Sequence, residues 1–464
     1  MIKLMTEKRG MQLKLLDTKI TIEDFVPKGH LLRKIEAAVD FSFIYDEVRK
    51  YYCADNGRPS VDPVQLVKYL LIGFLYNINS EREIEVEIQG SMPYRWFMGL
   101  NLDDRVPDHS TISQNRRRRF NGTNVYRRMF ERILSICIEK GLVDGKLILT
   151  DSTHVRANAS RRSEVKVVVE KETTNYMKRL DSYEAAEREK LEREGKLKPK
   201  NTIGKDGALP SFVERKVSTT DPDAGFLQRP GKPQGMHYLD HQSIDAKNGI
   251  IVDVAVTSGN VNDQMPFLDR IEYMREEVGL PIEAVGVDSA YDVGVIHHEL
   301  SENNIEVYTP ANNEKAWQKS EFTRENDFSY NTDSDIFTCP AGSTLILKRI
   351  QRNEGNVSKI YQARQRDCSR CSMRGKCLAP SQKFRRIYVS IFDAAFRLNH
   401  EKDGTADHKR VLDLRQIWSE GTFAAQKARH NLSRLYRRGL EAAEEHCLMS
   451  AMAVNLKRMV KCMG

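Results

Sequence analysis

The sequence predicts an α/β protein in which a mixed β-sheet forms the core and a helical region precedes it. Residues 64–77 carry apolar side chains on nearly every helical face, and short helical segments continue to about residue 140. From Lys146 onward, short apolar runs typical of buried strands alternate with helical segments. The order of strand, hairpin, helix, strand, helix, strand and helix indicates a layered arrangement with strands of both directions.

The length and composition indicate a globular protein with several domains. A chain of 464 residues is too long for one average domain, so about two to four are expected. Hydrophobic residues make up 40% and charged residues 30% of the chain, which excludes a fully disordered or acidic solvating protein. The net charge of +8 permits a nucleic-acid partner without demonstrating one, because it is small for this length.

Nothing in the sequence predicts a membrane segment or secretion. The longest apolar stretch, 69–76, is much shorter than the roughly 20 residues that a spanning helix needs. The N-terminal MIKLMTEKRG has no apolar signal region. Eight cysteines in such a chain indicate reduced thiols or metal ligands rather than disulfides. We therefore expect a cytoplasmic protein without a membrane partner.

The positive charge is concentrated in two segments. Residues 114–132 carry a net charge of +6 and residues 406–440 a net charge of +5, so the rest of the chain is negative. Each segment is either a solvated helix face or a surface that binds a phosphate backbone. Four consecutive arginines, 116–119, point in different directions on a helix, so at most two or three of them can contact one ligand.

The helical N-terminal region has recognisable element boundaries. Ser60 and Pro63 predict the start of the buried helix 64–77, and a second helix is expected over 81–89. The aromatic run YRWFMGL predicts core, and Asp108, Ser110 or Thr111 in PDHST is the cap of the helix that carries the arginines. A series of short helices with a basic last member resembles a helix-turn-helix-like DNA-binding module.

The α/β region begins with KLILTD, a predicted buried strand that ends at Asp151. Residues 161–200 carry twelve basic and nine acidic residues and predict an exposed helical insertion, and 196–235 predicts a loop. A hairpin is expected over 237–256, because two β-rich runs flank an Asn-Gly turn. A helix at 263–277, a strand ending at Asp288, a helix, a strand at 305–308, an interruption at 311–405 and a helical end complete the order.

Asp151 and Asp288 stand where chemistry is often located, at the ends of buried strands. Mg²⁺ prefers carboxylate oxygens, and two such ions can activate a water and stabilise a leaving oxygen in phosphoryl transfer. About three acids are needed for two ions, and the third is expected from a later helix. The alternative is that each aspartate only caps a helix or a turn.

Several stretches, taken in order, resemble a DDE transposase of a bacterial insertion sequence. GRPSVDPVQLVKYLLIGFLYNINSEREIEVEIQ and YRWFMGLNLDDRVPDHSTISQNRRRRF resemble the N-terminal domain of these enzymes. LTDSTHVRANAS, HYLDHQSIDAKNGIIVDVAVTSGNVNDQMPF and VGVDSAYD resemble the two aspartate motifs and the hairpin between them. WSEGTFAAQKARHNLSRLYRRGL and AMAVNLKRM resemble the glutamate helix and the closing helix. The resemblance covers about 50–460 and implies an RNase H-like catalytic core.

The resemblance implies a site in which Asp151, Asp288 and Glu420 are the catalytic acids and hold two Mg²⁺ ions, with Mn²⁺ as a substitute. Lys427 completes the Glu-x6-Lys signature of the group and is expected to contact a DNA phosphate. The longer signature Tyr-x2-Arg-x3-Glu-x6-Lys is not intact, because positions 413 and 416 are Asp and Gln and Arg415 lies one residue early. The residues expected to contact DNA are Lys427, Arg415, Arg116, Arg117, Arg119, Arg429 and Arg434.

Tyr291 and Asp292 follow the second aspartate closely and are interpreted as packing and helix-capping residues. The resemblance also implies partners, namely double-stranded DNA as terminal inverted repeats and as target, and a bacterial, nucleoid-associated location. By analogy, a homodimer on DNA is expected, because two ends must be brought together.

Four cysteines in the interrupting segment have ligand-like spacing. Cys339 precedes the pair Cys368-x2-Cys371, and Cys377 follows. Four thiolates satisfy tetrahedral Zn²⁺ without an open position, which predicts a structural zinc site with a β-hairpin between the first cysteine and the pair. Free cysteines in a reducing cell are the alternative.

These inferences give a layout of four regions. A helical DNA-binding domain is expected over 1–140, the first part of an RNase H-like core over 141–310 with a charged helical insertion at about 161–205, a cysteine-containing insertion over 311–405, and the helical end of the core over 406–464. Two other functions remain open: a catalytically inactive or domesticated DNA-binding relative, and a non-transposing RNase H-like nuclease. A transposase nicks DNA in the presence of Mg²⁺, whereas an inactive DNA-binding relative does not. A transposase also transfers strands to target DNA, whereas a non-transposing nuclease does not.

Overall fold

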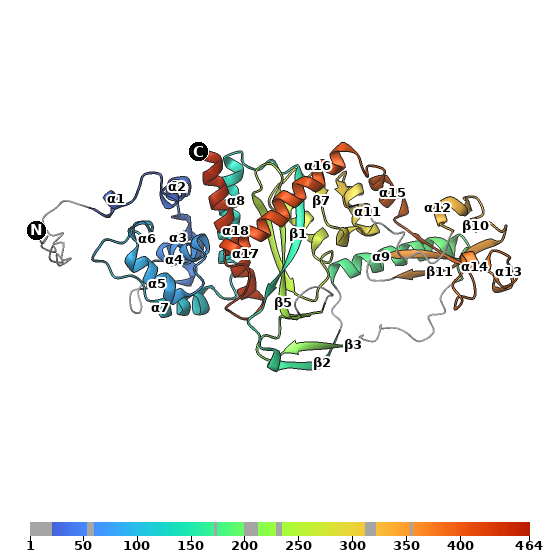
Figure 1. Cartoon of the computed structure of the whole chain (residues 1–464), viewed down its shortest axis with the longest axis horizontal. Coiled ribbons are helices and arrows are strands. Elements are labelled where there is room, and N and C mark those ends of the chain that lie inside the picture. The colour runs from blue at the N-terminus through green and yellow to red at the C-terminus, as the bar shows by residue number, and fades with distance from the viewer. Residues whose placement is uncertain are drawn as a thin grey trace, which may run out of the picture.

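Helices gather at one end of the molecule, a β-sheet lies in the middle, and a second sheet lies at the far end (Figure 1). This arrangement comes from a computed structural model. It describes residues 21–52, 60–170, 174–198, 212–228, 234–310, 322–352 and 356–464.

Local signals in the sequence explain the N-terminal helices. The Asp62 side chain accepts hydrogen bonds from the backbone N–H groups of Val64 and Gln65, at 2.8 and 3.0 Å, and so caps α4. Of the three cap candidates for α7, the structure selects Asp108, whose side chain accepts a hydrogen bond from the Ser110 N–H at 2.8 Å. The elements are α1 (Ile22–Phe25), α2 (Leu31–Ala38), α3 (Phe43–Val48), η1 (Arg49–Tyr51), α4 (Pro63–Tyr76), α5 (Glu81–Gly90), α6 (Met92–Phe97), α7 (His109–Asn115), η2 (Arg116–Phe120) and α8 (Val125–Glu139).

The central sheet is mixed, as the sequence predicts. Its strands are β1 (Leu147–Arg156), β4 (Gly225–Leu227), β5 (Gly235–Asp245), β6 (Ile251–Ser258), β7 (Ala284–Gly286) and β8 (Glu306–Tyr308). They follow the order β4-β5-β1-β7-β8, with β6 paired to β5. β5 is antiparallel to both β1 and β6, whereas β7 is parallel to β1 and to β8. Every residue of β5 is buried, because the strand lies inside the sheet and helices cover it.

Helices cover this sheet and complete the core. They are α10 (Phe267–Glu276), η4 (Ser289–Tyr291), α11 (Gly294–Glu302), α16 (Ala406–Arg415), the π-helical turn η6 (Gln416–Glu420), α17 (Gly421–Arg429) and α18 (Leu440–Met463). The buried helix α18 packs against β6, α8 and α4 and so joins the N-terminal helices to the sheet. None of the helices in the described ranges is long and apolar enough to cross a lipid bilayer.

Two sequence expectations about strands are wrong. β1 does not end at Asp151 but continues to Arg156, because pairing with β5 runs without a break from Ile148 to Arg156. The segment 196–235 is not only a loop, since it contains β4 and β3 (Phe212–Ser218). β3 pairs with β2 (Glu164–Glu170). The valines of β2 favour a strand, but the many charged residues of 161–200 led to the prediction of a helix there.

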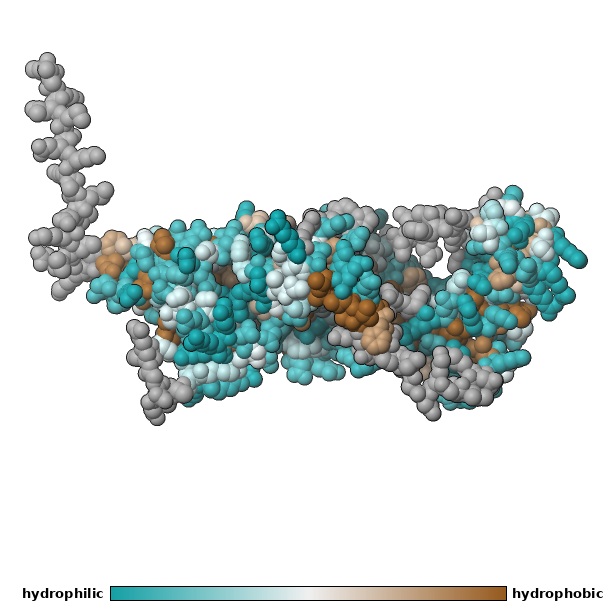
Figure 2. Space-filling view, turned by 90° about the horizontal axis from the view of Figure 1, so that it is seen from below, coloured by the Kyte–Doolittle hydropathy of each residue, from teal (hydrophilic) through white to brown (hydrophobic). Residues whose placement is uncertain are grey.

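The charged insertion also contains the expected helix, α9 (Asn175–Arg193), while 171–173 and 199–211 lie outside the described residues. Figure 2 shows a largely hydrophilic face with an apolar patch near its middle, where β2 and β3 are nearest the viewer. Val165, Val168 and Phe212 are the large exposed apolar residues of this ribbon.

The cysteine-containing segment forms a separate sheet with its own small core. Its strands follow the order β13-β12-β11-β10-β9, and the predicted hairpin is the antiparallel pair β11–β12. Phe337, Leu345 and Tyr361 are buried between its elements. These elements are α12 (Arg324–Asp327), β9 (Ser329–Asn331), β10 (Ile336–Thr338), β11 (Thr344–Arg352), β12 (Val357–Ala363), α13 (Gln365–Ser369), α14 (Arg374–Cys377), β13 (Arg386–Ser390) and α15 (Asp393–His400).

Candidate active site

One aspartate lies on β1 and the other lies just beyond the end of the neighbouring parallel strand β7, at the same level. Leu149 of β1 pairs with Gly286 of β7, and Asp151 and Asp288 each lie two residues further along the chain. Gly286 leaves no space for a side chain here, because an added Cβ would lie 2.7 Å from Val411 Cγ1 of α16. The close approach of α16 to the strands brings the helix that precedes Glu420 to the same edge.

The three acids differ in exposure. The side chain of Asp151 is 17% exposed, that of Asp288 45% and that of Glu420 51%. Burial raises the pKa of Asp151 to about 6, although the neighbouring Arg415 acts in the opposite direction. Asp288 also accepts a hydrogen bond from the backbone N–H of Ser289 at 2.7 Å.

One guanidinium connects all three carboxylates. Nη1 of Arg415 lies 3.0 Å from Asp151 Oδ2, and Nη2 lies 3.1 Å from Glu420 Oε1 and 4.0 Å from Asp288 Oδ1. The structure therefore brings the three predicted acids together around Arg415. Three carboxylates with a single cation between them form a strongly anionic oxygen-rich group, which is the donor set that Mg²⁺ prefers.

Lys427 lies on the same side of the sheet edge as the acids. Its Nζ donates a hydrogen bond to Thr153 Oγ1 at 2.6 Å, and Thr153 is two residues beyond Asp151 on β1. Because residues two apart on a strand share a face, Lys427 extends the surface that begins at Asp151.

The arginines predicted to bind DNA differ in how far their side chains are exposed. Arg116 is buried, donates from Nε to Glu445 at 2.8 Å and also pairs with Glu81. We correct the expectation that it contacts DNA, because its guanidinium is enclosed between two carboxylates. Arg119 lies 4.3 Å over the ring of Tyr52. Arg117, Arg429 and Arg434 are exposed.

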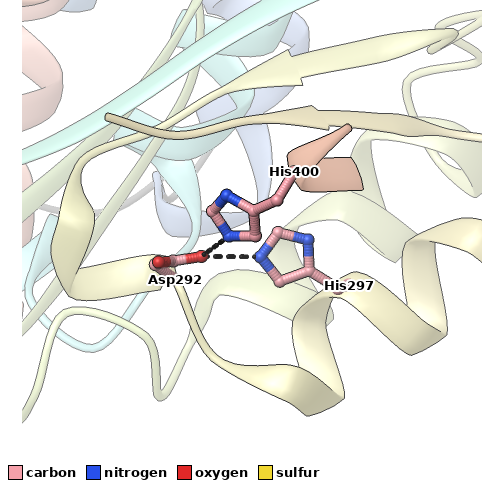
Figure 3. Close-up of side chains that lie close together, drawn as sticks. All are labelled: Asp292, His297 and His400. Atoms are coloured by element: carbon pink, nitrogen blue, oxygen red, sulfur yellow. Dashed lines mark hydrogen bonds and ion pairs between the residues drawn. The ribbon is translucent and has the colours of Figure 1, made fainter. Parts of the chain in front are cut away.

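Three side chains that lie close together, Asp292, His297 and His400, were not found as a group from the sequence (Figure 3). Asp292 Oδ1 accepts from Nε2 of His297 at 2.9 Å and from Nε2 of His400 at 3.0 Å. His400 Nδ1 also lies 2.9 Å from Asp403 Oδ2. Asp292 is thus an ion-pair partner rather than a helix cap, whereas Tyr291 is buried as predicted.

The electrostatics of this group favour an ion pair. The hydrogen bond to Asp292 raises the pKa of His400 to about 9, against the effect of burial. Burial alone would raise the pKa of Asp292, but the hydrogen bonds from both histidines lower it to about 2. No local motif links Asp292 to His400, because they meet only in the folded chain.

The four cysteines of the insertion lie near one another. Burial raises the pKa of the Cys377 thiol, and the thiols of Cys368, Cys339 and Cys371 add to this effect through their proximity. Among the described residues, the groups whose candidate ligand atoms all lie within 4.8 Å of one another are two others, Asp292–His297–His400 and Glu85–Asp108–His109. The four thiols are therefore clustered but more widely spaced than those groups.

Two family profiles match the sequence. A profile described as a transposase domain (DUF772) matches residues 20–118, and one described as a transposase DDE domain matches 338–460. No curated protein matches the sequence. A solved structure, the cryo-EM structure of the piggyBac transposase synaptic complex with hairpin DNA, is 9% identical with a TM-score of 0.31, and the match covers 93% of this chain and 74% of that chain.

The second profile spans Glu420, Lys427 and the four cysteines of the insertion, and the first spans the helices that end at the arginine run. A transposase domain near the beginning of the chain and a transposase DDE domain near its end together support a DDE transposase of insertion-sequence type, an enzyme that cleaves DNA and transfers its strands, and the DDE domain implies an RNase H-like core.

Proposed function

We propose that Asp151, Asp288 and Glu420 are the catalytic acids of this transposase and hold two Mg²⁺ ions, which Mn²⁺ can replace. The observation that carries the proposal is the convergence of the three carboxylates on the single cation Arg415. Bound ions of this kind supply an activated water and stabilise the leaving oxygen. The chain's own contribution is to fix the acids on β1, just beyond the end of β7 and at the end of the turn η6, so that little reorganisation is needed when DNA arrives.

Cationic side chains around the acids are positioned to hold the DNA backbone. Lys427 lies beyond Asp151 on the same surface and can neutralise a phosphate next to the bond that is cut. Arg429 and Arg434, which follow Lys427 in the chain, and Arg117 of the N-terminal helices are exposed and can also bind phosphates. We propose that these residues bind the terminal inverted repeats and the target DNA.

The assembly that this reaction requires contains two copies of the chain. Both ends of an insertion sequence must be brought together, cut and joined to target DNA. We therefore propose a homodimer on DNA in which each copy acts on one end. The freed 3′-hydroxyl then attacks a phosphodiester of the target in line.

The cysteine cluster serves a structural purpose in this proposal. Cys339, Cys368, Cys371 and Cys377 have thiolate chemistry that fits Zn²⁺, and they lie together beside a core too small to be stable alone. A zinc ion held there would fix the insertion without taking part in cleavage.

The test uses the full chain and a labelled duplex that carries one end of the element. We expect cleavage with Mg²⁺, joining of the 3′ end to target DNA, and loss of both activities in Asp151→Asn, Asp288→Asn and Glu420→Gln. Asp413→Asn is the matched control, because Asp413 is an exposed acid on the adjoining helix α16.

Each alternative outcome has a distinct meaning. Wild-type cleavage by Asp151→Asn would refute the assignment of the acids. Cleavage without joining would identify a nuclease, and binding of the duplex without cleavage would identify an inactive DNA-binding relative.

A further inference from the structure

We propose that Arg415 acts as an internal substitute for the metal ions, holding the three acids together in the free enzyme and giving up this position when DNA binds. This inference rests on the proposed role of the acids as metal ligands. It goes further by assigning a regulatory step to one side chain: the site takes up divalent ions weakly until a DNA phosphate offers the guanidinium another anion.

The position of the guanidinium is the first argument. Two of its nitrogens reach three carboxylates at 3.0, 3.1 and 4.0 Å, and the side chain of Arg415 is only 12% exposed. A guanidinium is planar, always charged and carries five N–H donors, so it can satisfy several carboxylates at once. Without a cation, three converging carboxylates would repel one another strongly in this partly buried edge.

The backbone between Arg415 and Glu420 is the second argument. Glu420 follows Arg415 by five positions, and on a regular α-helix such an offset would point the two side chains about 140° apart. Here the turn η6 is π-helical, and the N–H of Gly421 bonds to the carbonyl of Gln416 five residues earlier. A π-helical turn brings residues five apart onto one face. The family signature has its arginine four positions before the glutamate, whereas Arg415 lies five positions before Glu420. The wider π-helical turn accommodates this additional residue, so Arg415 still reaches the acids.

Trp418 keeps the π-helical turn in place. Its ring lies against Gly249 in the turn of the β5–β6 hairpin, where an added Cβ would collide with the ring. Arg458 of α18 lies 5.3 Å from the centre of the same ring. The turn is thus seated on a hairpin and a core helix, and Trp418 and Gly249 are positioning residues for Arg415.

Competition for the acids has a thermodynamic consequence. Divalent ions must displace the guanidinium from the carboxylates, so Arg415 weakens metal binding in the free enzyme. DNA that draws Arg415 onto a phosphate removes this competition, and metal and DNA then bind cooperatively. Such coupling would limit metal loading, and hence cleavage, to enzyme that has bound an end.

The test measures Mn²⁺ binding to the full-length protein without DNA, from the free-ion electron paramagnetic resonance signal. We expect Arg415→Gln to bind Mn²⁺ about tenfold more tightly than the wild type, because one unit of positive charge next to the ligand oxygens is removed. Asp413→Asn should leave the affinity unchanged. Adding the end duplex should tighten Mn²⁺ binding to the wild type and change binding to Arg415→Gln much less.

Three further variants separate the possible failures. If Asp151→Asn lowers Mn²⁺ affinity but Arg415→Gln does not raise it, the substitute role of Arg415 is refuted and the acid assignment stands. If neither Asp151→Asn nor Glu420→Gln changes Mn²⁺ binding, the proposed metal site itself fails. Arg415→Lys, which keeps the charge, guards against a folding effect and should bind Mn²⁺ no more than about threefold more tightly than the wild type.

Discussion

Replacing His400 with glutamine should destabilise the protein in a pH-dependent way. The introduced amide can still donate to Asp292, but it cannot carry the positive charge that His400 shares between Asp292 and Asp403. The pKa of His400 rises from 6.5 to about 9 on folding, so its protonated form stabilises the native state fully below about pH 6.5. That contribution is lost as the pH rises from 6.5 towards 9. The pKa difference corresponds to about 3 kcal/mol.

Urea unfolding followed by tryptophan fluorescence tests this prediction at about pH 6 and about pH 9.5. The difference in the free energy of unfolding between wild type and His400→Gln should be about 3 kcal/mol larger at the lower pH. His298→Gln is the control for the loss of an imidazole ring, because His298 packs its ring against Tyr183 and Phe392. An equal difference for His400→Gln at both pH values would refute the ion pair.

Three further predictions concern other parts of the chain. Arg116→Ala should lower the free energy of unfolding by about 3 kcal/mol in urea titrations, because Glu445 stays buried and loses a partner. Gly249→Ala should lower the free energy of unfolding by about 2 kcal/mol in the same titrations, because its positive φ and its contact with Trp418 of the π-helical turn both oppose a Cβ. Gly404→Ala is the control and should lower the free energy of unfolding less, because Gly404 has a positive φ but open space around it. Cys371→Ser should remove one zinc per chain by elemental analysis, whereas zinc content equal to wild type would refute the thiolate site.

The sequence predicted those features that depend on local patterns. The Asn-Gly turn marks the β5–β6 hairpin, and the apolar runs before Asp151 and Asp288 mark two strands, which proved to be parallel neighbours. The alignment of the two aspartates with each other depends on the register of β1 and β7, which the sequence does not specify and the structure shows. The valines of β2 were overlooked because the surrounding charges dominated the composition of that segment.

Features that depend on long-range contacts could not be predicted. Arg116 belongs to a basic run, yet Glu445, more than three hundred residues away in sequence, turns it inward. A π-helical turn has no clear sequence signal, so the offset of Arg415 from the family signature looked like a departure. The contact of Asp292 with His400 is likewise formed by folding alone.

The contacts around Asp292 also show how the cysteine-containing segment is connected to the core. Thr309, where the chain leaves the core, donates from Oγ1 to Asp292 at 3.4 Å, and its carbonyl lies 2.8 Å from Nε2 of His408. His400, where the chain returns, binds the same carboxylate. Exit and return therefore meet at one point of the core, as at the junction of a domain inserted within another. Segments of very different length or content can be exchanged at this junction during evolution, or by design, while the acids on either side of it keep their positions.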